Sequence, residues 1–451
     1  MPEQVRPLRI GAGAGFADDR IEPAVELAER GDLDYLVFEC LAERTIALAQ
    51  IERRRDPAAG FNEWLGARMR AVLEPCTRQG VKIITNMGAA NPLAGARLVA
   101  DVATEMSLAG LKVAAVEGDD VLTLVAGRGL PLIEREASLD DLGESVVSAN
   151  AYLGCEPIIA ALEAGADVVV AGRVADPAMF LAPLVHEFGW PLDDWRRLAC
   201  GVGVGHLLEC AGHVTGGYFA DPGVKDVPDL ARLGFPIAQV EADGSFVITK
   251  VEGTGGRVDV ATCTEQLLYE VHDPSAYVTP DVVADFSGVR LMQMAENVVA
   301  AAGFEGCERP DHLKVSVGYS DGFIGEGQIS YAGPNAVARG RLALDIVRER
   351  LDLLDIAITD ARFDLIGIDA VHRGPTPDSH AEPMEVRARV AARAPTRDAA
   401  VRVGHEVASL WLNGPAGGGG AVRTATEVIA VASVLIPRLD VETRCTVVES
   451  A

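Results

Sequence analysis

The feature that most constrains the fold is a short apolar run, Val168–Ala171, framed by helix and turn signals. Gly165 precedes it and is suited to end a helix, because glycine readily adopts the left-handed conformation. The run is continuous and mostly β-branched, which is typical of a strand buried on both faces. Arg173 and Asp176 follow where that strand should end, and Pro177 can open the next helix. We therefore expect a guanidinium and a carboxylate at the carboxyl end of a buried strand, where open α/β sheets bind ligands.

The same order of strand and helix recurs through the first half of the chain. Strands are predicted at Leu8–Ile10, Tyr35–Phe38, Val81–Thr85, Lys112–Val116 and Ser145–Ala149, and helices at Ile21–Arg30, Ala42–Arg54 and Asn62–Arg78. Alternation of this kind favours a parallel sheet built by right-handed crossovers. We predict an α/β fold whose N-terminal, mostly parallel sheet is flanked by helices in a Rossmann-like, doubly wound arrangement.

The pattern changes after about Pro222, and the second half indicates an α+β domain. Asp243 and Gly244 lie in the middle of Val240–Thr249 and predict a hairpin. Further strands are predicted at Leu313–Tyr319, Phe323–Tyr331, Phe363–Ala370, Glu385–Ala392 and Glu427–Ile436, and helices at Thr262–Val271, Asn335–Leu353 and Arg397–Leu412. Because 451 residues are too many for one ordinary core, we predict two domains, residues 1–225 and 226–451.

Polar side chains follow the predicted strands at the points where those strands end. Because the carboxyl ends of parallel strands meet at one edge of a sheet, these side chains should gather in one place. A carboxyl group there can act as a general acid or base when burial raises its pKa. The members of this predicted set are Glu39, Asn86, Glu117, Asn150 and Arg173.

Each member of the set has an expected role. Glu39 or Glu117 is the predicted catalytic acid or base, and Arg173 is the predicted anchor for an anionic substrate. Glu39 could instead bind a divalent cation. Glu117, Asp119 or Asp120 could form a carboxylate pair with Glu39, although Asp119 could simply cap the next helix. The remaining predicted substrate-binding residues are Asn86, Gly88, Asn150 and Asp176.

Two glycine-rich segments bear on cofactor binding. Gly11, Gly13 and Gly15 follow the first predicted strand, but the third glycine comes too early for a dinucleotide fingerprint. This spacing favours a tight strand-to-helix turn, whose amides could donate to a substrate anion, over a nicotinamide site. The second segment, Gly414–Gly420, lacks the ending of a nucleotide P-loop and could form an anion-binding nest, a lid or a linker. We predict no cofactor.

One cluster has metal-ligand residue types: His206, Cys210 and His213, with Glu209 alongside. Its spacing could place His206 and Cys210 on one helical face, but no fourth ligand follows at a diagnostic distance. Packing roles are favoured, and we predict no metal site. The chain also contains no G-x-S-x-G elbow and no H-E-x-x-H helix.

Charge and hydropathy exclude several classes of partner. The formal net charge is −26 and the pI is about 4.7, so nucleic acid and anionic membranes are not expected partners. No apolar run approaches the roughly 20 residues that span a bilayer, and Met1–Arg20 lacks a signal-peptide pattern. The eight cysteines are scattered, which favours reduced thiols and a cytoplasmic protein. A homo-oligomer is expected because most soluble assemblies are homo-oligomers.

Several long blocks resemble the acyclic terpene utilisation protein AtuA family. The resemblance covers at least the first 225 residues and continues through Val251–Gly256. The blocks that carry it are Arg9–Asp18, Asp34–Arg44, Tyr152–Pro157, Ala164–Pro177, His186–Trp190, Gly205–Cys210 and Thr215–Gly217.

This resemblance implies a bacterial cytosolic protein in the catabolism of branched acyclic terpenoids such as citronellol and geraniol, a route that runs through acyl-CoA thioesters. It implies a pathway and no catalytic residues. Some relatives carry an extra C-terminal domain that this chain lacks, for which a small partner protein could substitute. The leading expectation is a hydro-lyase acting on a branched carboxylate or its CoA thioester. The alternative is a non-catalytic scaffold, or one subunit of a heteromeric acyl-CoA enzyme.

Overall fold

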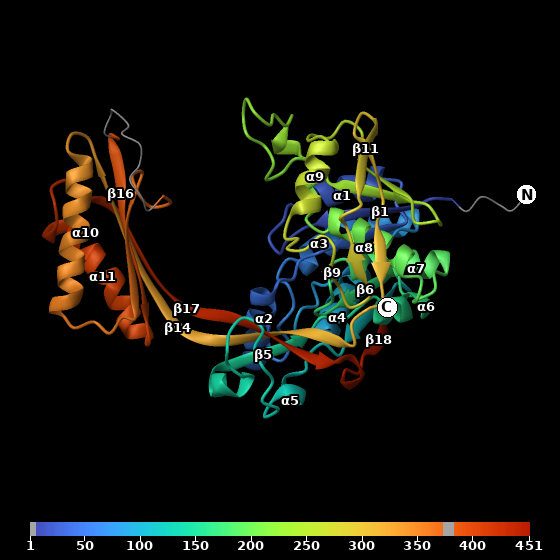
Figure 1. Ribbon diagram of the computed structural model, residues 1–451, viewed down its shortest axis with the longest axis horizontal. Helices are drawn as coiled ribbons and strands as arrows, with labels where there is room; N and C mark the ends of the chain where they lie inside the picture. Colours follow the sequence, from blue (N-terminus) through green and yellow to red (C-terminus); the bar gives the residue numbers. More distant parts are fainter. Residues whose placement is uncertain (1–5, 373–382) are drawn as a thin grey trace, which may run out of the picture. The chain divides into compact units, whose positions relative to one another are not determined.

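The computed structural model describes residues 6–372 and 383–451, and it divides into two compact units. Unit 1 comprises the chain up to Gly318 together with Val431–Ala451, and unit 2 comprises Tyr319–Ala430. Figure 1 labels many of the elements of the two units. The chain is a mixed α/β protein, as predicted, with helices and large sheets in both units.

Unit 1 is built on a ten-stranded sheet with the order β11-β12-β8-β7-β1-β2-β3-β6-β4-β18. Its strands are β1 (Leu8–Ala14), β2 (Tyr35–Phe38), β3 (Lys82–Thr85), β4 (Lys112–Glu117), β6 (Val168–Ala171), β7 (Pro236–Val240), β8 (Phe246–Lys250), β11 (Arg290–Ala295), β12 (Val298–Ala302) and β18 (Arg444–Glu449). The neighbours from β1 to β4 run parallel, and the others pair antiparallel. This order is not the 3-2-1-4-5-6 order of a dinucleotide-binding sheet, so the Rossmann-like description stays a prediction.

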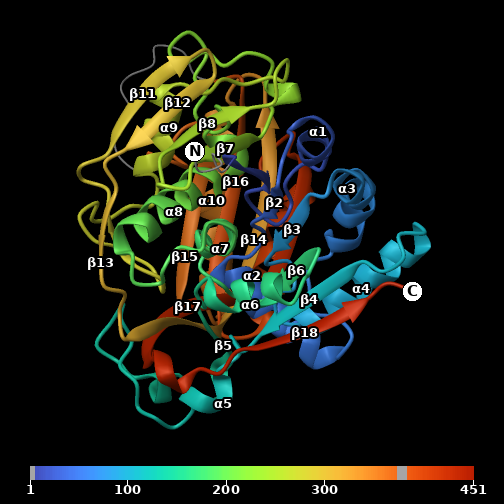
Figure 2. The ribbon, with the colours of Figure 1, turned by 90° about the vertical axis from the view of Figure 1, so that its right-hand side faces the viewer.

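Two groups of helices pack against this sheet. In one group α1 contacts α3 and α3 contacts α4, and in the other α6 contacts α7 and α7 contacts α8. Figure 2 shows β2, β3 and β4 lying between these groups, with β18 running beside β4. The helices of unit 1 are α1 (Glu22–Arg30), α2 (Glu43–Arg55), α3 (Leu65–Gln79), α4 (Pro92–Glu105), α5 (Leu122–Val125), α6 (Glu156–Glu163), α7 (Ala178–Phe188), α8 (Trp195–Leu208) and α9 (Val260–Leu268).

The apolar residues of the parallel strands explain why these strands lie in the centre of the sheet. All four residues of β6 and of β2 are buried, as expected for β-branched and aromatic strands covered on both faces. The predicted glycine turn at Gly11 is wrong, because β1 continues through Gly11 and Gly13 to Ala14. A side chain at Gly13 would meet the ring of Phe38 on the neighbouring strand, at 2.6 Å from a Cβ. These glycines therefore allow close packing inside the sheet.

The predicted division at residues 225 and 226 does not coincide with the two units. The hairpin of β7 and β8 pairs with β1 and extends the N-terminal sheet, so unit 1 continues well past residue 226. A small second sheet of unit 1 joins β13 (Glu305–Cys307), β10 (Val283–Asp285) and β9 (Tyr277–Val278).

The strand predicted near Ser145 forms, but outside the central sheet. It is β5 (Val146–Ala151), and it pairs with β14 (His312–Ala332). Within unit 1 the amide of Gly318 donates to the hydroxyl of Ser148 (3.2 Å). A local pattern can predict a strand but not its partner, because pairing depends on distant segments.

Unit 2 has its own sheet, in the order β15-β16-β14-β17, and two helices that contact β16. Its elements are the later part of β14, α10 (Ala336–Leu353), β15 (Asp360–Ile366), β16 (Glu385–Ala394), α11 (Arg397–Asn413) and the first part of β17 (Gly419–Pro437). The core between helices and sheet includes Leu344, Val347, Val403 and Val407. The two strands predicted within residues 313–331 are one strand, β14.

Replacing Gly13 by alanine should destabilise unit 1. The added Cβ would lie 2.6 Å from the buried ring of Phe38, and overpacking of this kind costs about 1–3 kcal/mol. Urea unfolding measures the effect. Gly419→Ala is the matched control, because a Cβ there meets nothing within 4 Å, and its free energy of unfolding should change by less than about 0.5 kcal/mol. Equal effects in the two variants would contradict the packing role of Gly13.

Candidate functional site

Four of the five predicted strand-end residues lie at the carboxyl ends of parallel strands. Glu39 follows β2, Asn86 follows β3, Arg173 comes two residues after β6, and Glu117 is the last residue of β4. Asn150 lies inside β5, outside the central sheet. The structure gives these residues positions, and their roles in binding or catalysis stay predictions.

Glu39 and Asn86 form a buried hydrogen-bonded pair. The amide of Asn86 donates to the Glu39 carboxylate (3.0 Å), and the backbone amide of Leu41 donates to the same oxygen (2.9 Å). The side-chain oxygen of Asn86 in turn accepts from the amide of Cys40 (2.7 Å). Burial raises the pKa of Glu39 well above its usual value, Asp176 adds to the rise, and Arg173 opposes it. Glu39 therefore has the environment of a carboxyl group that can hold a proton.

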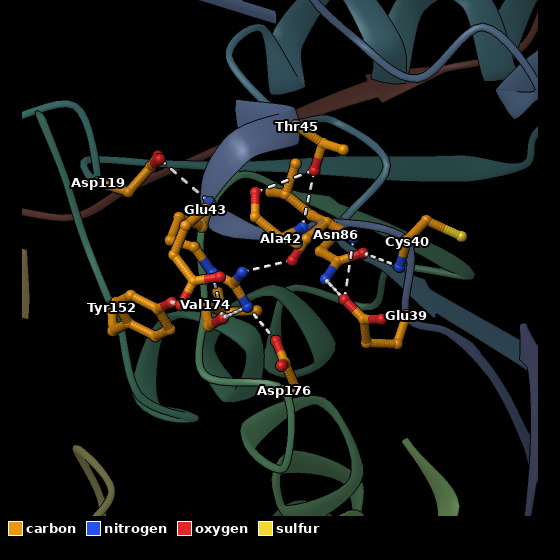
Figure 3. Close-up of polar contacts among 12 residues, drawn as sticks. Glu39, Cys40, Ala42, Glu43, Thr45, Asn86, Asp119, Tyr152, Val174 and Asp176 are labelled. Carbon is orange, nitrogen blue, oxygen red and sulfur yellow. Dashed lines mark hydrogen bonds and ion pairs between the residues drawn. The ribbon is translucent and has the colours of Figure 1, made fainter. Parts of the chain in front are cut away.

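Arg173 is buried and its donors are used within the protein. Its side chain is 1% exposed; Nε donates to the carbonyl of Val174 (2.8 Å), and the terminal nitrogens reach the carbonyl of Leu41 and the carboxylate of Asp176. Its guanidinium also lies over the ring of Tyr152, 4.5 Å from the centroid. Its donors are therefore occupied within the protein, and its role as a substrate anchor stays a prediction. Arg173 positions Asp176 and Tyr152 through these contacts; both of these residues are labelled in Figure 3.

Asp119 and Asn150 form a second buried pair behind Arg173. One Asp119 oxygen accepts from the Asn150 amide (2.8 Å) and from the backbone amide of Arg173 (3.0 Å). Burial raises the pKa of Asp119 to about 6, against the effect of these hydrogen bonds. Asp119 thus links Asn150 to the backbone of Arg173 rather than capping a helix, and the substrate-binding role of Asn150 stays a prediction.

Glu117 is not brought into this group. Its carboxylate pairs with Arg444 of β18 (2.7 Å), which stands opposite it in the antiparallel register. The sequence could not predict this partner, because β18 comes from the end of the chain. The predicted pairing of Glu117 with Glu39 is therefore wrong.

The glycines predicted to bind substrate serve close packing. Gly11 and Gly13 lie within β1, and the amide of Gly15 donates to the carboxylate of Asp19 (2.9 Å). A Cβ on Gly88 would lie 2.6 Å from the carbonyl oxygen of Ala171, so only glycine fits there. In each case the contacts are within the protein, and a substrate role for these residues stays a prediction.

The structure reveals a pocket beside Asp176 that the sequence did not predict, here called the carboxylate pocket. Its volume is about 340 Å³, and most of its wall is apolar. Glu39, Glu117 and Arg173 are not among the described residues that line it. Its lining residues are Glu43, Tyr152, Ala175, Asp176, Pro177, Tyr277, Val278, Thr279, Pro280, Pro310, His312, Leu313, Lys314 and Leu435.

The two carboxyl groups of this pocket have opposite pKa shifts. Burial alone would raise the pKa of Glu43, but the hydroxyl of Tyr152 and the ammonium of Lys314 lower it below its usual value. Burial raises the pKa of Asp176, against the effect of Arg173, and the charge of Glu43 adds to the rise. Figure 3 shows Glu43, Tyr152 and Asp176 in one cluster. A pocket that separates two carboxyl pKa values in this way can supply both an acid and a base.

Lys314 contributes a positive charge to the same wall. Its Nζ lies 3.5 Å from a Glu43 oxygen and 5.0 Å from the centroid of the Tyr152 ring, and its side chain is 46% exposed. Unlike Arg173, Lys314 lines the pocket, and part of its side chain is exposed to solvent. No local pattern marks Lys314, because it lies on β14 and joins the site only through the pairing with β5.

His206 and Glu209 form a buried pair near the carboxylate pocket. Nε2 of His206 lies 3.2 Å from the carbonyl oxygen of Leu267, so this nitrogen carries a proton. Nδ1 lies 3.0 Å from the Glu209 carboxyl, and that contact requires a further proton shared between the two groups. Burial raises the pKa of Glu209 to about 7. The ring of Tyr277, which lines the carboxylate pocket, lies 5.1 Å from the His206 ring.

Two features are absent from the described residues. Across residues 6–372 and 383–451, no three histidine, cysteine, aspartate or glutamate side chains are grouped so that they could hold a metal ion. In the same part of the chain, no helix combines the length and apolar character needed to cross a membrane.

A comparison with protein families identifies a match over nearly the whole chain. The family described as acyclic terpene utilisation family protein AtuA matches residues 8–447. No curated protein and no solved structure matches the chain significantly. The match extends the resemblance of the N-terminal blocks through both compact units.

Replacing Arg173 by methionine should destabilise the fold by about 1–3 kcal/mol, because it leaves the carbonyls of Val174 and Leu41 without their buried donor. Urea unfolding at pH 7 measures this loss. The matched control is Arg444→Met, whose side chain is 70% exposed in its pair with Glu117, and it should cost less than about 1 kcal/mol. A small loss for Arg173→Met would contradict the positioning role.

The Asp119→Asn variant should remove a pH dependence of stability. Because the folded-state pKa of Asp119 is raised from 3.8 to about 6, its stabilising contribution is complete below pH 3.8 and is lost as pH rises through 6. The parent should therefore lose up to about 3 kcal/mol relative to the variant between pH 4 and pH 7.

Chemical unfolding at several pH values tests this expectation. Asp273→Asn is the control: the hydrogen bonds from Ser275 lower the pKa of Asp273, so this variant and the parent should lose stability in parallel between pH 4 and pH 7. A parent and an Asp119→Asn variant with parallel stability profiles would show that burial does not raise this pKa.

Proposed function

Because the chain belongs to the acyclic terpene utilisation AtuA family, which suggests a catabolic role, we propose that it is an enzyme acting on a branched carboxylate or acyl-CoA thioester. The reaction class that fits its site best is hydration or dehydration by acid–base chemistry. The observation that carries this proposal is the carboxylate pocket, where Glu43 and Asp176 have pKa values shifted in opposite directions.

In the dehydration direction, the substrate is a 3-hydroxyacyl group. Ionised Glu43 removes a proton from the carbon next to the carbonyl, and protonated Asp176 donates a proton to the departing hydroxyl, which leaves as water. The bond between the two carbons becomes a double bond, so atoms and charges balance. Hydration is the same sequence reversed.

Other groups of the pocket supply binding and charge stabilisation. The ammonium of Lys314 is the donor for the developing negative charge on the carbonyl oxygen. The apolar wall, including Leu313, Val278 and Leu435, suits a branched hydrocarbon chain, and about 340 Å³ lies in the range of small-molecule sites. This set differs from the predicted pair Glu39 and Glu117.

Glu39 and the His206–Glu209 pair act from outside the pocket. The charge of Glu39 is coupled to Asp176, so a proton on either carboxyl favours ionisation of the other. The charge of Asp176 also raises the pKa of Glu209. We propose that Glu39 and the His206–Glu209 pair help to set the pKa of Asp176.

The test is turnover of branched 3-hydroxyacyl-CoA and 2-enoyl-CoA thioesters by the purified chain. Asp176→Asn should lower kcat by about 10²–10⁴-fold, because asparagine cannot donate the proton. Lys314→Met should lower kcat/KM by about tenfold or more, because the developing charge loses its donor. Lys225→Met is the matched control: this lysine pairs with Glu265 outside the pocket, and its removal should leave the kinetics unchanged.

Turnover that is unaffected by Asp176→Asn would contradict the proposed acid. Turnover that appears only after a small second protein is added would instead support the alternative of a subunit in a heteromeric enzyme.

A further inference from the structure

One edge of the sheet of unit 2 is unpaired. β17 is the last strand of that sheet: it pairs with β14 on one side and, among the described residues, with no strand on the other. The opposite edge strand, β15, is partly closed by its own chain, because the backbone amide of Leu365 donates to the carboxylate of Asp369 (2.9 Å). An unpaired strand presents a row of backbone N–H and C=O groups that can pair with another chain.

β17 lacks the features that usually protect an edge strand. Natural edge strands are often short, or they carry proline or several charged side chains. β17 is 19 residues long, and its proline is its last residue, Pro437. Five of the ten residues 421–430 are β-branched, and only two are charged, Arg423 and Glu427. This edge is therefore suited to pair with a strand of another molecule.

The sequence of this edge is complementary to itself. Residues 422–428 read Val-Arg-Thr-Ala-Thr-Glu-Val, which is symmetric about Ala425 except that arginine on one side corresponds to glutamate on the other. In an antiparallel pair of two copies with Ala425 at the two-fold axis, side chains at equal distances from Ala425 lie opposite each other on the same face. The facing pairs are Val422 with Val428, Arg423 with Glu427, and Thr424 with Thr426.

This register uses the pair types that stabilise neighbouring strands. Opposite charges, two threonines and two β-branched side chains are each favourable when they face each other across an antiparallel pair. Moving the two-fold axis by one residue would place Arg423 opposite Ala425 or Ile429, and both ion pairs would be lost. The charges therefore select one register.

The side chains of the facing pairs are accessible. Val422 is 50% exposed, and Arg423 and Glu427 are both exposed. Within the chain, Nη1 of Arg423 lies 3.2 Å from Nδ1 of His405, and the carboxylate of Glu427 accepts from the hydroxyl of Ser320 (2.9 Å). These partners carry no negative or positive charge to match, so both charges are available for an ion pair.

We propose that the chain forms a two-fold dimer in which β17 of each copy pairs antiparallel with β17 of the other, so that the two unit 2 sheets become one continuous sheet. Main-chain hydrogen bonds supply the affinity, and the facing side chains fix the register. This dimer is independent of the reaction proposed for the carboxylate pocket, because every residue that lines the pocket belongs to unit 1.

Sedimentation equilibrium of the purified chain tests the proposal and should give the mass of a dimer. Glu427→Arg places arginine opposite Arg423 at both symmetry-related positions, and the dissociation constant of the dimer should rise by about tenfold or more. The double variant Arg423→Glu/Glu427→Arg restores both ion pairs with the charges exchanged, and its dissociation constant should return to within about threefold of the parent value.

Glu349→Arg is the matched control for the change of charge. Glu349 is an exposed residue of α10 in the same unit, so this variant should dimerise like the parent. Circular dichroism checks that each variant is folded.

Ala425 provides a test of the geometry, because it is the residue that would face its own copy. Facing residues of antiparallel strands have Cα atoms about 4.5–5.5 Å apart, which is within the range of a disulfide. Ala425→Cys should give a disulfide-linked dimer on mild oxidation, seen by non-reducing electrophoresis. Val401→Cys, at an exposed position of α11, should give no more cross-linking than the parent.

Three results would each overturn the proposal. They are a parent chain that sediments as a monomer, a Glu427→Arg variant that dimerises as tightly as the parent, and a double variant that dimerises no better than Glu427→Arg alone.

Discussion

The buried guanidinium of Arg173 is the interaction on which the site depends. It joins the chain after β2, through the carbonyl of Leu41, to the chain after β6, through Val174 and Asp176. A guanidinium without solvent must satisfy its donors inside the protein, because an unpaired buried charge is very costly. The ends of two parallel strands are therefore held in fixed positions, and the ring of Tyr152 is fixed against them.

This arrangement explains why neighbouring carboxyl groups have different proton affinities. Asp176 loses hydration, and its pKa rises although Arg173 is beside it. Glu43 accepts a hydrogen bond from the hydroxyl of Tyr152 and lies beside the positive charge of Lys314, and both interactions lower its pKa. Because each negative charge raises the pKa of its neighbours, Glu39, Asp176 and Glu43 titrate as an interacting group rather than separately. Acid–base chemistry in the carboxylate pocket would use the difference between the pKa values of Asp176 and Glu43.

Local patterns in the sequence predicted the parts of the fold that depend on local physics. The strands Tyr35–Phe38 and Val168–Ala171 have the bounds predicted from their apolar residues, and Arg173 and Asp176 lie where the end of a buried strand suggested. Contacts between distant segments could not be predicted. The pairing of β18 with β4 places Arg444 opposite Glu117, and the pairing of β5 with β14 places Lys314 in the wall of the carboxylate pocket. Residue type and spacing also cannot show that a guanidinium is already fully bonded.

The most direct test of the central claim is a measurement of the two carboxyl pKa values in the folded chain, by 13C NMR titration with assignment from Asp176→Asn and Glu43→Gln. The account predicts that Asp176 titrates above the ordinary value of 3.8 and that Glu43 titrates below the ordinary value of 4.5, so that Glu43 loses its proton first. If Asp176 loses its proton before Glu43, the pocket does not separate the two groups as described, and the acid–base account is contradicted.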